Sequence, residues 1–166
     1  MPPVVSVDFT AALAQYQALL WRVCRLYCTD EDEQQDLYQE IMLQLWKAWP
    51  RYEGRAKLST WLYRIALNVA ISAVRERKRR PAAAPLSAAT HALPAPAPDG
   101  PDSDELAALY RAIASLSQLD KALVLLYLEE RPYEEIAEIL GITANNARVK
   151  MHRAQDKLRH LLLPSK

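Results

Sequence analysis

The chain has 166 residues, 51% of them apolar and only three of them glycine, which is enough apolar material to build a folded core. Its net charge is +1, but residues 51–80 carry nine Lys/Arg against two Asp/Glu, and residues 141–166 carry six against one. An acidic block precedes each basic block, and this segregation predicts two separate contacts with a polyanion.

Several protein classes are disfavoured by what the sequence lacks. The N-terminus has no basic start followed by an apolar run, and no apolar stretch approaches the roughly 20 residues that span a bilayer, so we expect a cytoplasmic protein without membrane insertion. No nucleophile motif, metal-ligand set or phosphate loop is evident, so we expect no enzyme, no catalytic residue, no cofactor and no metal. No segment alternates strictly with β-branched residues, which predicts an all-α fold.

The first predicted helix carries both cysteines. Its apolar residues follow 3-and-4 spacing: Leu13, Tyr16, Leu20, Val23 and Tyr27. Cys24 and Cys28 lie one helical turn apart, and with a distant His91 they raise the alternative of a metal site. A zinc site needs four ligands and the chain offers no second pair, so we interpret the two thiols as small buried side chains in a reducing cell.

The second predicted helix, residues 33–49, has two contrasting sides and stops at Pro50. One side is apolar and is predicted to face the core: Tyr38, Ile41, Met42, Leu45 and Trp49. The opposite side carries Asp36, Glu40, Leu43 and Lys47, with Gln39 beside them. A leucine in the middle of a charged face favours a protein interface over a merely solvated face.

The third predicted helix lies in "GRAKLSTWLYRIALNVAISAVRERKRR", residues 54–80, with Ser59 or a neighbour as its N-cap. Apolar residues on two nearly opposite sides predict a helix clamped between neighbours: Leu58, Leu62, Ile65 and Val69, and then Tyr63, Leu67, Ile71 and Val74. The gap between these two sides continues back to Lys57 and holds Trp61, Arg64, Asn68, Arg75 and Arg79.

This third helix has the side chains that bind single-stranded nucleic acid, because bases stack on an aromatic ring and guanidinium groups hold phosphates. Trp61 fits a core position equally well, and both readings stay open. The terminal "RERKRR" is most simply a phosphate grip at a helix end.

Residues 81–104 divide the chain. They hold six of the eleven prolines and lack aromatic residues, which is typical of an extended linker. We therefore predict two small helical domains joined by this Pro/Ala-rich linker, residues 1–80 and residues 105–166.

The second domain is predicted to end in a helix-turn-helix. Helices over residues 104–116 and 118–130 precede "PYEEIAEILG", a turn "GIT" and a helix over residues 144–163. Gly141 allows the tight turn and Ile142 fills the angle between the two last helices. Their packed faces are predicted to be Ile136, Ala137 and Leu140, and then Ala147, Met151, Ala154 and Leu158.

The outward side of the last helix has side chains suited to the major groove: Asn145, Arg148, Val149, His152 and Arg153. Arginine pairs with guanine, asparagine pairs with adenine, and an apolar tip contacts a thymine methyl group. The alternative is a plain helical hairpin with a solvated face, which the basic character of residues 141–166 disfavours.

Three stretches together resemble one family. "DLYQEIMLQLWKAW", "YEGRAKLSTWLYRIALNVAISAVRERKRR" and "PYEEIAEILGITANNARVKMHRAQDKLRHLL" are similar, in this order, to the extracytoplasmic-function group of bacterial RNA polymerase sigma factors. The resemblance implies a region 2-like domain in residues 1–80 for polymerase docking and −10 element recognition and melting. It implies a region 4-like domain in residues 105–166 for −35 element recognition.

The resemblance also implies roles for single residues. The docking helix would contact the β′ clamp of core RNA polymerase through Asp36, Gln39, Glu40 and Leu43. The −10 element, as single-stranded DNA, would contact Lys57, Ser59, Thr60, Trp61, Arg64, Asn68, Arg75 and Arg79. The −35 element would contact Asn145, Asn146, Arg148, Val149, His152 and Arg153.

The resemblance also implies two further partners, the polymerase β flap and an anti-sigma factor. It implies that the linker runs toward the RNA exit path, where its acidic end would mimic nucleic acid. The recognition helix "TANNARVKM" departs from the glycine-threonine pair of many members, so promoter bases do not carry over. The alternative function is a stand-alone helix-turn-helix regulator, which needs neither a docking face nor a single-strand surface.

Overall fold

The computed structural model describes residues 8–79 and 104–163, which are helical with short connections. They belong to two compact units, Met1–Ala97 and Pro98–Lys166, which we call unit 1 and unit 2. The all-α prediction is confirmed for these residues. The predicted linker lies outside the described residues except for Asp104, which begins a helix.

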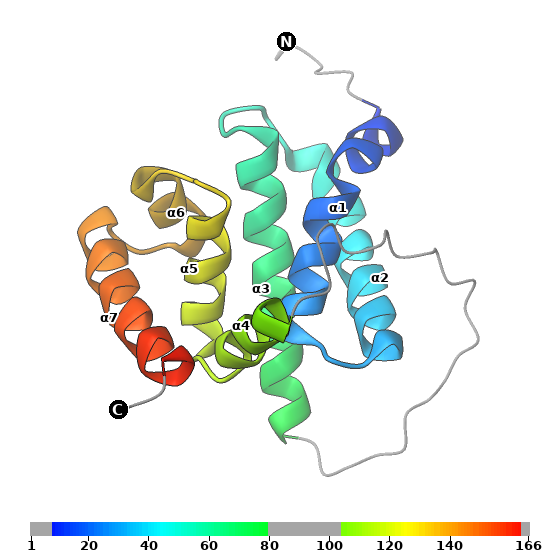
Figure 1. The fold of residues 1–166 in the computed structure, drawn as a ribbon. Coiled ribbons are helices and arrows are strands. Elements are labelled where there is room, and N and C mark those ends of the chain that lie inside the picture. Colours follow the sequence, from blue (N-terminus) through cyan, green and yellow to red (C-terminus); the bar gives the residue numbers. More distant parts are fainter. Residues whose placement is uncertain (1–7, 80–103, 164–166) are drawn as a thin grey trace. The chain divides into compact units, whose positions relative to one another are not determined.

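Within residues 8–79, unit 1 has three long helices, and each packs against the other two. Its elements are α1 (Phe9–Tyr27), α2 (Glu31–Ala48), a short 3-10 turn η1 (Trp49–Arg51) and α3 (Leu58–Arg79), as Figure 1 shows. The carboxylate of Asp8 caps α1 by accepting from the Thr10 backbone N–H at 3.2 Å. Pro50 ends α2 because its ring is incompatible with a continuing α-helix.

The core of unit 1 is apolar and aromatic. Trp21 of α1 stacks on Tyr38 of α2 with ring centroids 4.2 Å apart and an angle of 6° between the planes. Further fully buried side chains come from all three helices: Leu20, Val23, Ile41, Leu45, Leu62, Tyr63 and Leu67.

Both cysteines lie in this core, as predicted. Burial, and to a smaller extent the neighbouring Cys28, raises the pKa of the Cys24 thiol to about 12. Burial likewise raises the pKa of the Cys28 thiol. Both groups are therefore protonated at neutral pH and act as small apolar side chains.

The predicted two-sided clamping of α3 is only partly right. The buried residues form one arc of the helix: Thr60, Leu62, Tyr63, Ala66, Leu67 and Ala70. Ile65 and Val69 are only half-buried, because α1 and α2 together cover a single side of α3 in unit 1.

The described part of unit 2, residues 104–163, has four helices, of which α7 packs against each of the others. They are α4 (Asp104–Ala114), α5 (Gln118–Leu128), α6 (Tyr133–Leu140) and α7 (Ala144–Leu162). Ser117 caps α5 by accepting from the Asp120 N–H at 3.2 Å, and Thr143 caps α7 by accepting from the Asn146 N–H at 3.0 Å.

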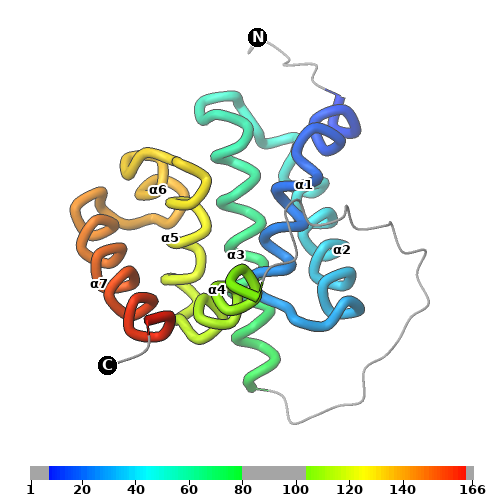
Figure 2. The backbone as a smooth tube through the Cα atoms, viewed as in Figure 1, coloured from blue at the N-terminus to red at the C-terminus, as the bar shows by residue number. Residues whose placement is uncertain are grey.

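The turn between α6 and α7 completes the predicted helix-turn-helix, and its path is clear in Figure 2. Gly141 has φ 69°, a left-handed conformation that favours glycine. The N–H groups of Gly141 and Ile142 both donate to the Ala137 carbonyl, at 2.9 and 3.1 Å. The packed faces differ from prediction in two details: α6 buries Ile139 while Leu140 is only half-buried, and Leu158 of α7 is also only half-buried.

Among the described residues, no helix is both long enough and apolar enough to cross a membrane.

Candidate nucleic-acid and protein interfaces

The side of α2 that faces away from the core is exposed, as predicted. The side chains predicted for docking all lie on it: Asp36, Gln39, Glu40 and Leu43. Leu43 is 46% exposed, while Ile41 and Leu45 on either side of it are fully buried. The Glu40 carboxylate accepts from the Gln44 side-chain amide at 2.9 Å, one helical turn further along α2. This surface, which we call the α2 face, combines carboxylates with an exposed apolar side chain.

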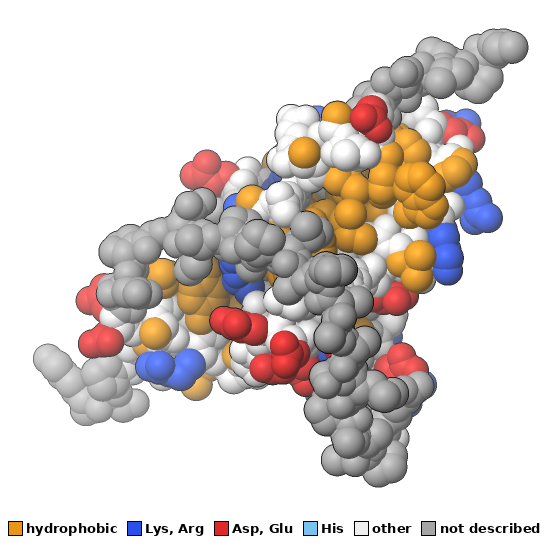
Figure 3. Space-filling model, turned by 90° about the vertical axis from the view of Figure 1, so that its right-hand side faces the viewer, with side chains coloured by type: hydrophobic (Ala, Val, Ile, Leu, Met, Phe, Trp, Pro, Cys, Tyr) orange, Lys and Arg blue, Asp and Glu red, His pale blue; other side chains and the backbone are white. Residues whose placement is uncertain are grey.

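Sequence reasoning missed Trp46, which extends the α2 face. Its side chain is 63% exposed and follows Leu43 by three residues, so the two lie on neighbouring turns. The Trp46 ring makes an edge contact with Phe9 of α1 at a centroid distance of 5.1 Å. Figure 3, viewed from the side on which α1 and α2 lie in Figure 1, shows hydrophobic side chains gathered there with Lys or Arg side chains at the margin. An exposed tryptophan beside an exposed leucine is typical of a protein interface.

An aromatic cluster joins the end of α2 to the start of α3. Trp49 lies 5.8 Å from Tyr52 and 5.9 Å from Trp61, and Tyr52 lies 5.0 Å from Trp61. The Tyr52 hydroxyl donates to the Ala56 carbonyl at 2.8 Å, which holds the connecting loop. Trp61 is half-buried. It therefore packs against the cluster and still presents part of its surface to solvent.

The exposed side of α3 carries a continuous row of polar side chains, which we call the α3 stripe: Arg64, Asn68, Ser72, Arg75 and Arg79. They recur at spacings of three and four, so they follow one side of the helix next to Trp61. Within residues 8–79 and 104–163, none of the three arginines forms an ion pair. The side chains predicted to contact single-stranded DNA at these positions therefore lie on one exposed stripe, and whether they bind DNA stays a prediction.

Two predicted members of the single-strand surface have other environments. Thr60 is 2% exposed and belongs to the buried arc of α3, so its side chain does not reach the stripe. Helix α3 begins at Leu58, which places Ser59 in the first turn rather than at the N-cap, and its side chain is half-buried. Lys57 is exposed, and its carbonyl accepts from the Trp61 N–H at 3.1 Å.

The arginines at the basic C-terminal end of α3 have different environments. The Arg77 guanidinium lies 2.9 Å from the Glu33 carboxylate of α2, and the same nitrogen donates to the Cys28 sulfur at 3.6 Å. Arg77 therefore ties the end of α3 to the α1–α2 corner. Arg75 and Arg79 point elsewhere on the helix and remain exposed.

A groove of about 570 Å³ separates the α2 face from the α3 stripe. Glu40 and Gln44 line it from α2, and Asn68, Ser72 and Glu76 line it from α3. The two carboxylates disfavour an anionic strand inside the groove. A nucleic acid strand on the α3 stripe therefore has to follow the outer side, where the arginines are.

The outward side of α7 is exposed at every position predicted to contact duplex DNA: Asn145, Asn146, Arg148, Val149, His152 and Arg153. The inward side buries Ala147, Met151 and Ala154 against the other helices of unit 2. Such a helix, presented by a tight turn, has the form that enters a major groove.

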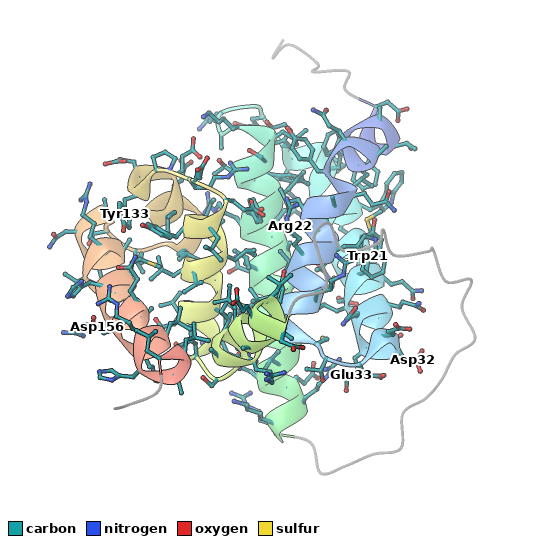
Figure 4. All side chains as sticks on the ribbon, viewed as in Figure 1. Trp21, Arg22, Asp32, Glu33, Tyr133 and Asp156 are labelled. Atoms are coloured by element: carbon teal, nitrogen blue, oxygen red, sulfur yellow. The ribbon has the colours of Figure 1, made fainter. Side chains whose placement is uncertain are left out.

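Two residues on this side of α7 have partners within unit 2. The Arg148 guanidinium lies 3.2 Å from the Glu134 carboxylate and 5.2 Å from the centroid of the Tyr133 ring, both of α6. His152 lies 3.6 Å from the Asp156 carboxylate. Figure 4 labels Tyr133 on α6 and Asp156 on α7.

Both units match known family models. The Sigma-70 region 2 model matches residues 12–80, and the Sigma-70, region 4 model matches residues 106–158. The RNA polymerase sigma factor CarQ of Myxococcus xanthus is 34% identical over 132 residues, which cover 77% of this chain and 74% of CarQ. The chain belongs to the extracytoplasmic-function group of RNA polymerase sigma factors.

The two sigma regions divide the surfaces described above between them. Region 2 contains the α2 face and the α3 stripe, and region 4 contains the helix-turn-helix. The ECF RNA polymerase sigma factor SigG of Mycobacterium tuberculosis is 38% identical over 74 residues, which cover 45% of this chain and only 20% of SigG. This sigma factor thus matches about a fifth of the length of SigG.

A solved structure confirms the fold. The sigma factor RpoE from Bartonella quintana, in complex with the anti-sigma factor NepR, has a TM-score of 0.72 and 22% sequence identity to this sigma factor. The match covers 93% of this chain and 96% of RpoE.

Proposed function

We propose that this sigma factor binds core RNA polymerase in the cytoplasm and directs promoter recognition and DNA opening, without a catalytic site of its own. The observation that carries the proposal is that one unit has both the α2 face and the α3 stripe, whose arginines form no ion pair with any described residue. A stand-alone helix-turn-helix regulator needs only the outward side of α7. The region 2 match and both surfaces of unit 1 therefore favour a sigma factor over that alternative.

The α2 face is the proposed docking surface for the β′ clamp. Asp36, Gln39 and Glu40 supply polar contacts, and Leu43 with Trp46 supplies the apolar centre. Interfaces of this kind derive most of their binding free energy from a few apolar or aromatic anchors within a polar rim. Trp46 is therefore expected to matter more than any one carboxylate.

The α3 stripe is the proposed path of the melted −10 strand. Extracting a base from a duplex costs a few kcal/mol, and stacking on an aromatic ring returns about 1–3 kcal/mol per base. Trp61 lies next to the α3 stripe, and its aromatic side chain is partly exposed. Arg64, Arg75 and Arg79 would hold the phosphates, with Asn68 between them and Lys57 and Ser59 at the start of the helix.

The outward side of α7 is the proposed reader of the −35 element. Arg148 and Arg153 have the donor geometry for guanine, Asn145 and Asn146 suit adenine, and Val149 suits a thymine methyl group. His152 adds a polar contact to the DNA backbone. Residues 81–104 are the proposed linker between this reader and unit 1.

Two further partners are proposed for this sigma factor. One is the β flap of the polymerase, which the family resemblance implies as a contact of this chain. The other is an anti-sigma factor. RpoE of Bartonella quintana, which has the same fold, was solved in complex with such a protein.

The test is retention of the full chain by immobilised core RNA polymerase. We expect the wild type to bind and the triple variant Asp36→Ala/Glu40→Ala/Leu43→Ala to lose binding. The matched control Glu31→Ala/Glu53→Ala removes two exposed carboxylates of unit 1 that lie off the α2 face, and it should bind like the wild type.

Circular dichroism of each variant verifies folding. A folded wild type that core polymerase does not retain would overturn the proposed function. Equal retention of the wild type and the triple variant would instead remove the α2 face from the docking surface.

A further inference from the structure

Arg148 lies between two side chains of the preceding helix. Its guanidinium is 3.2 Å from the Glu134 carboxylate and 5.2 Å from the centre of the Tyr133 ring. Tyr133 is half-buried and its ring lies 6.3 Å from that of Tyr127 on α5, so the ring has support from behind. Glu134 is exposed on its other sides. Arg148, Glu134 and Tyr133 therefore form a cluster that connects α7 to α6 across the turn of the helix-turn-helix.

This arrangement leaves Arg148 able to contact a base. A guanidinium has five N–H donors in a planar fork, and the Glu134 contact involves only the Nη2 nitrogen. A second hydrogen on that nitrogen and both hydrogens of the other terminal nitrogen remain, which is what a bidentate contact to guanine requires. Glu134 and a guanine can therefore be bound at the same time.

The exposure of the Arg148–Glu134 ion pair shows whether it would prevent Arg148 from contacting DNA or would orient Arg148 toward DNA. The Arg148 and Glu134 side chains are 50% and 72% exposed, and exposed ion pairs contribute little free energy. Such a pair is too weak to keep Arg148 away from a phosphate-lined groove. It is sufficient to bias which way a flexible side chain points, particularly when an aromatic face restricts the guanidinium plane as well.

We propose that Glu134 and Tyr133 are positioning residues that set the base preference of Arg148. Glu134 orients the fork of the Arg148 guanidinium toward a base edge, and the Tyr133 ring restricts the plane of that guanidinium. The proposal rests on the proposed reading of the −35 element by α7, and it adds a residue of α6 to the determinants of specificity.

The test is selection from a random 20-base-pair duplex library by the full chain assembled with core RNA polymerase, with core polymerase alone as background. The base preference at every position is compared between the wild type and variants. Arg148→Ala and Arg148→Lys identify the base pairs that Arg148 reads. We expect Glu134→Gln to lower the guanine preference at those same base pairs by about threefold to tenfold and to leave other positions unchanged. Tyr133→Leu should give a smaller loss at the same positions.

The matched control is Glu138→Gln. Glu138 lies one turn further along α6, is exposed, and forms no ion pair with any residue that the structure describes. This variant removes the same charge without touching Arg148, so its base preferences should equal those of the wild type. A general electrostatic effect of one carboxylate on α6 would change the two variants alike, whatever the effect on overall affinity.

Three outcomes would overturn the inference, and they are distinguishable. Identical profiles for Glu134→Gln and Glu138→Gln, with a clear Arg148-dependent preference, would refute the positioning role alone. An Arg148→Ala profile equal to the wild type would show that Arg148 reads no base. A wild type that adds no preference to core polymerase would refute the proposed function as well.

Discussion

Two residues of unit 2 share a left-handed backbone conformation but differ in side chain, and this predicts two stability changes of opposite sign. Gly141 has φ 69° at the end of α6, and Glu130 has φ 59° after α5. Both close a helix, since the Glu130 N–H donates to the Tyr127 carbonyl at 2.9 Å and the Arg131 N–H donates to the Leu126 carbonyl at 3.2 Å. Glycine adopts this conformation freely, whereas other L-residues are strained in it.

The magnitude for Gly141→Ala follows from the surroundings of the glycine. An added Cβ would meet no atom within 4 Å, so there is no steric term and only the backbone cost remains. We expect the free energy of unfolding of unit 2 to fall by about 1 kcal/mol. Glu130→Gly should raise it by up to about 1 kcal/mol, because Glu130 is exposed and loses no described contact.

The assay uses the uneven distribution of tryptophan. All four tryptophans, Trp21, Trp46, Trp49 and Trp61, lie in unit 1, so tryptophan fluorescence reports the unfolding of unit 1. Far-UV circular dichroism reports both units. In urea titrations both substitutions should move the circular dichroism transition and leave the fluorescence transition in place. A destabilising Glu130→Gly would refute the reasoning, because it would mean that the glutamate side chain contributes more than its backbone strain costs.

Three other predictions concern binding and pH. Trp61→Ala should leave duplex −35 binding intact and impair promoter opening, measured by 2-aminopurine fluorescence with core polymerase; normal opening by a folded variant would make Trp61 a packing residue only. Arg148→Ala or Arg153→Ala should weaken duplex binding by about 1–3 kcal/mol where the arginine makes a bidentate base contact, measured by fluorescence anisotropy, and unchanged affinity would remove that residue from the reader. Burial raises the pKa of Cys24 from 9.0 to about 12, so between these values the unfolded chain loses a proton that the folded chain keeps. The free energy of unfolding of unit 1 should therefore decrease above about pH 9, by up to about 1.4 kcal/mol per pH unit, and this decrease should become shallower in Cys24→Ala.

Helical periodicity was sufficient to predict the helices and the outward side of α7. The apolar positions of α2 and α7 recur every three or four residues, so their exposed sides followed directly from the spacing. The exposure of Leu43 was predictable for the same reason, because it lies opposite Ile41 and Leu45 on the helix. The bounds of α2 were less predictable, since Glu31 and Asp32 add a first turn that no apolar residue marks.

The rest depended on contacts between residues far apart in the sequence. The role of Arg77 is set by Glu33, more than 40 positions earlier, and no local pattern distinguishes Arg77 from Arg75 or Arg79. Thr60 was placed with its polar neighbours, although two turns of helix align it with buried Leu67. Trp46 lies at the edge of the exposed side of α2, where spacing alone does not say whether a large ring turns inward or outward.

The contact of Arg77 with Glu33 also bears on the geometry of the α3 stripe. The last turn of a helix usually frays, yet here it is fastened to the α1–α2 corner at 2.9 Å. Arg64 and Arg79 are then held about 22 Å apart along one straight axis, at 1.5 Å per residue. The helix therefore presents its arginines at fixed intervals. A strand that lies along α3 meets these cations on a rigid element and not on a flexible segment.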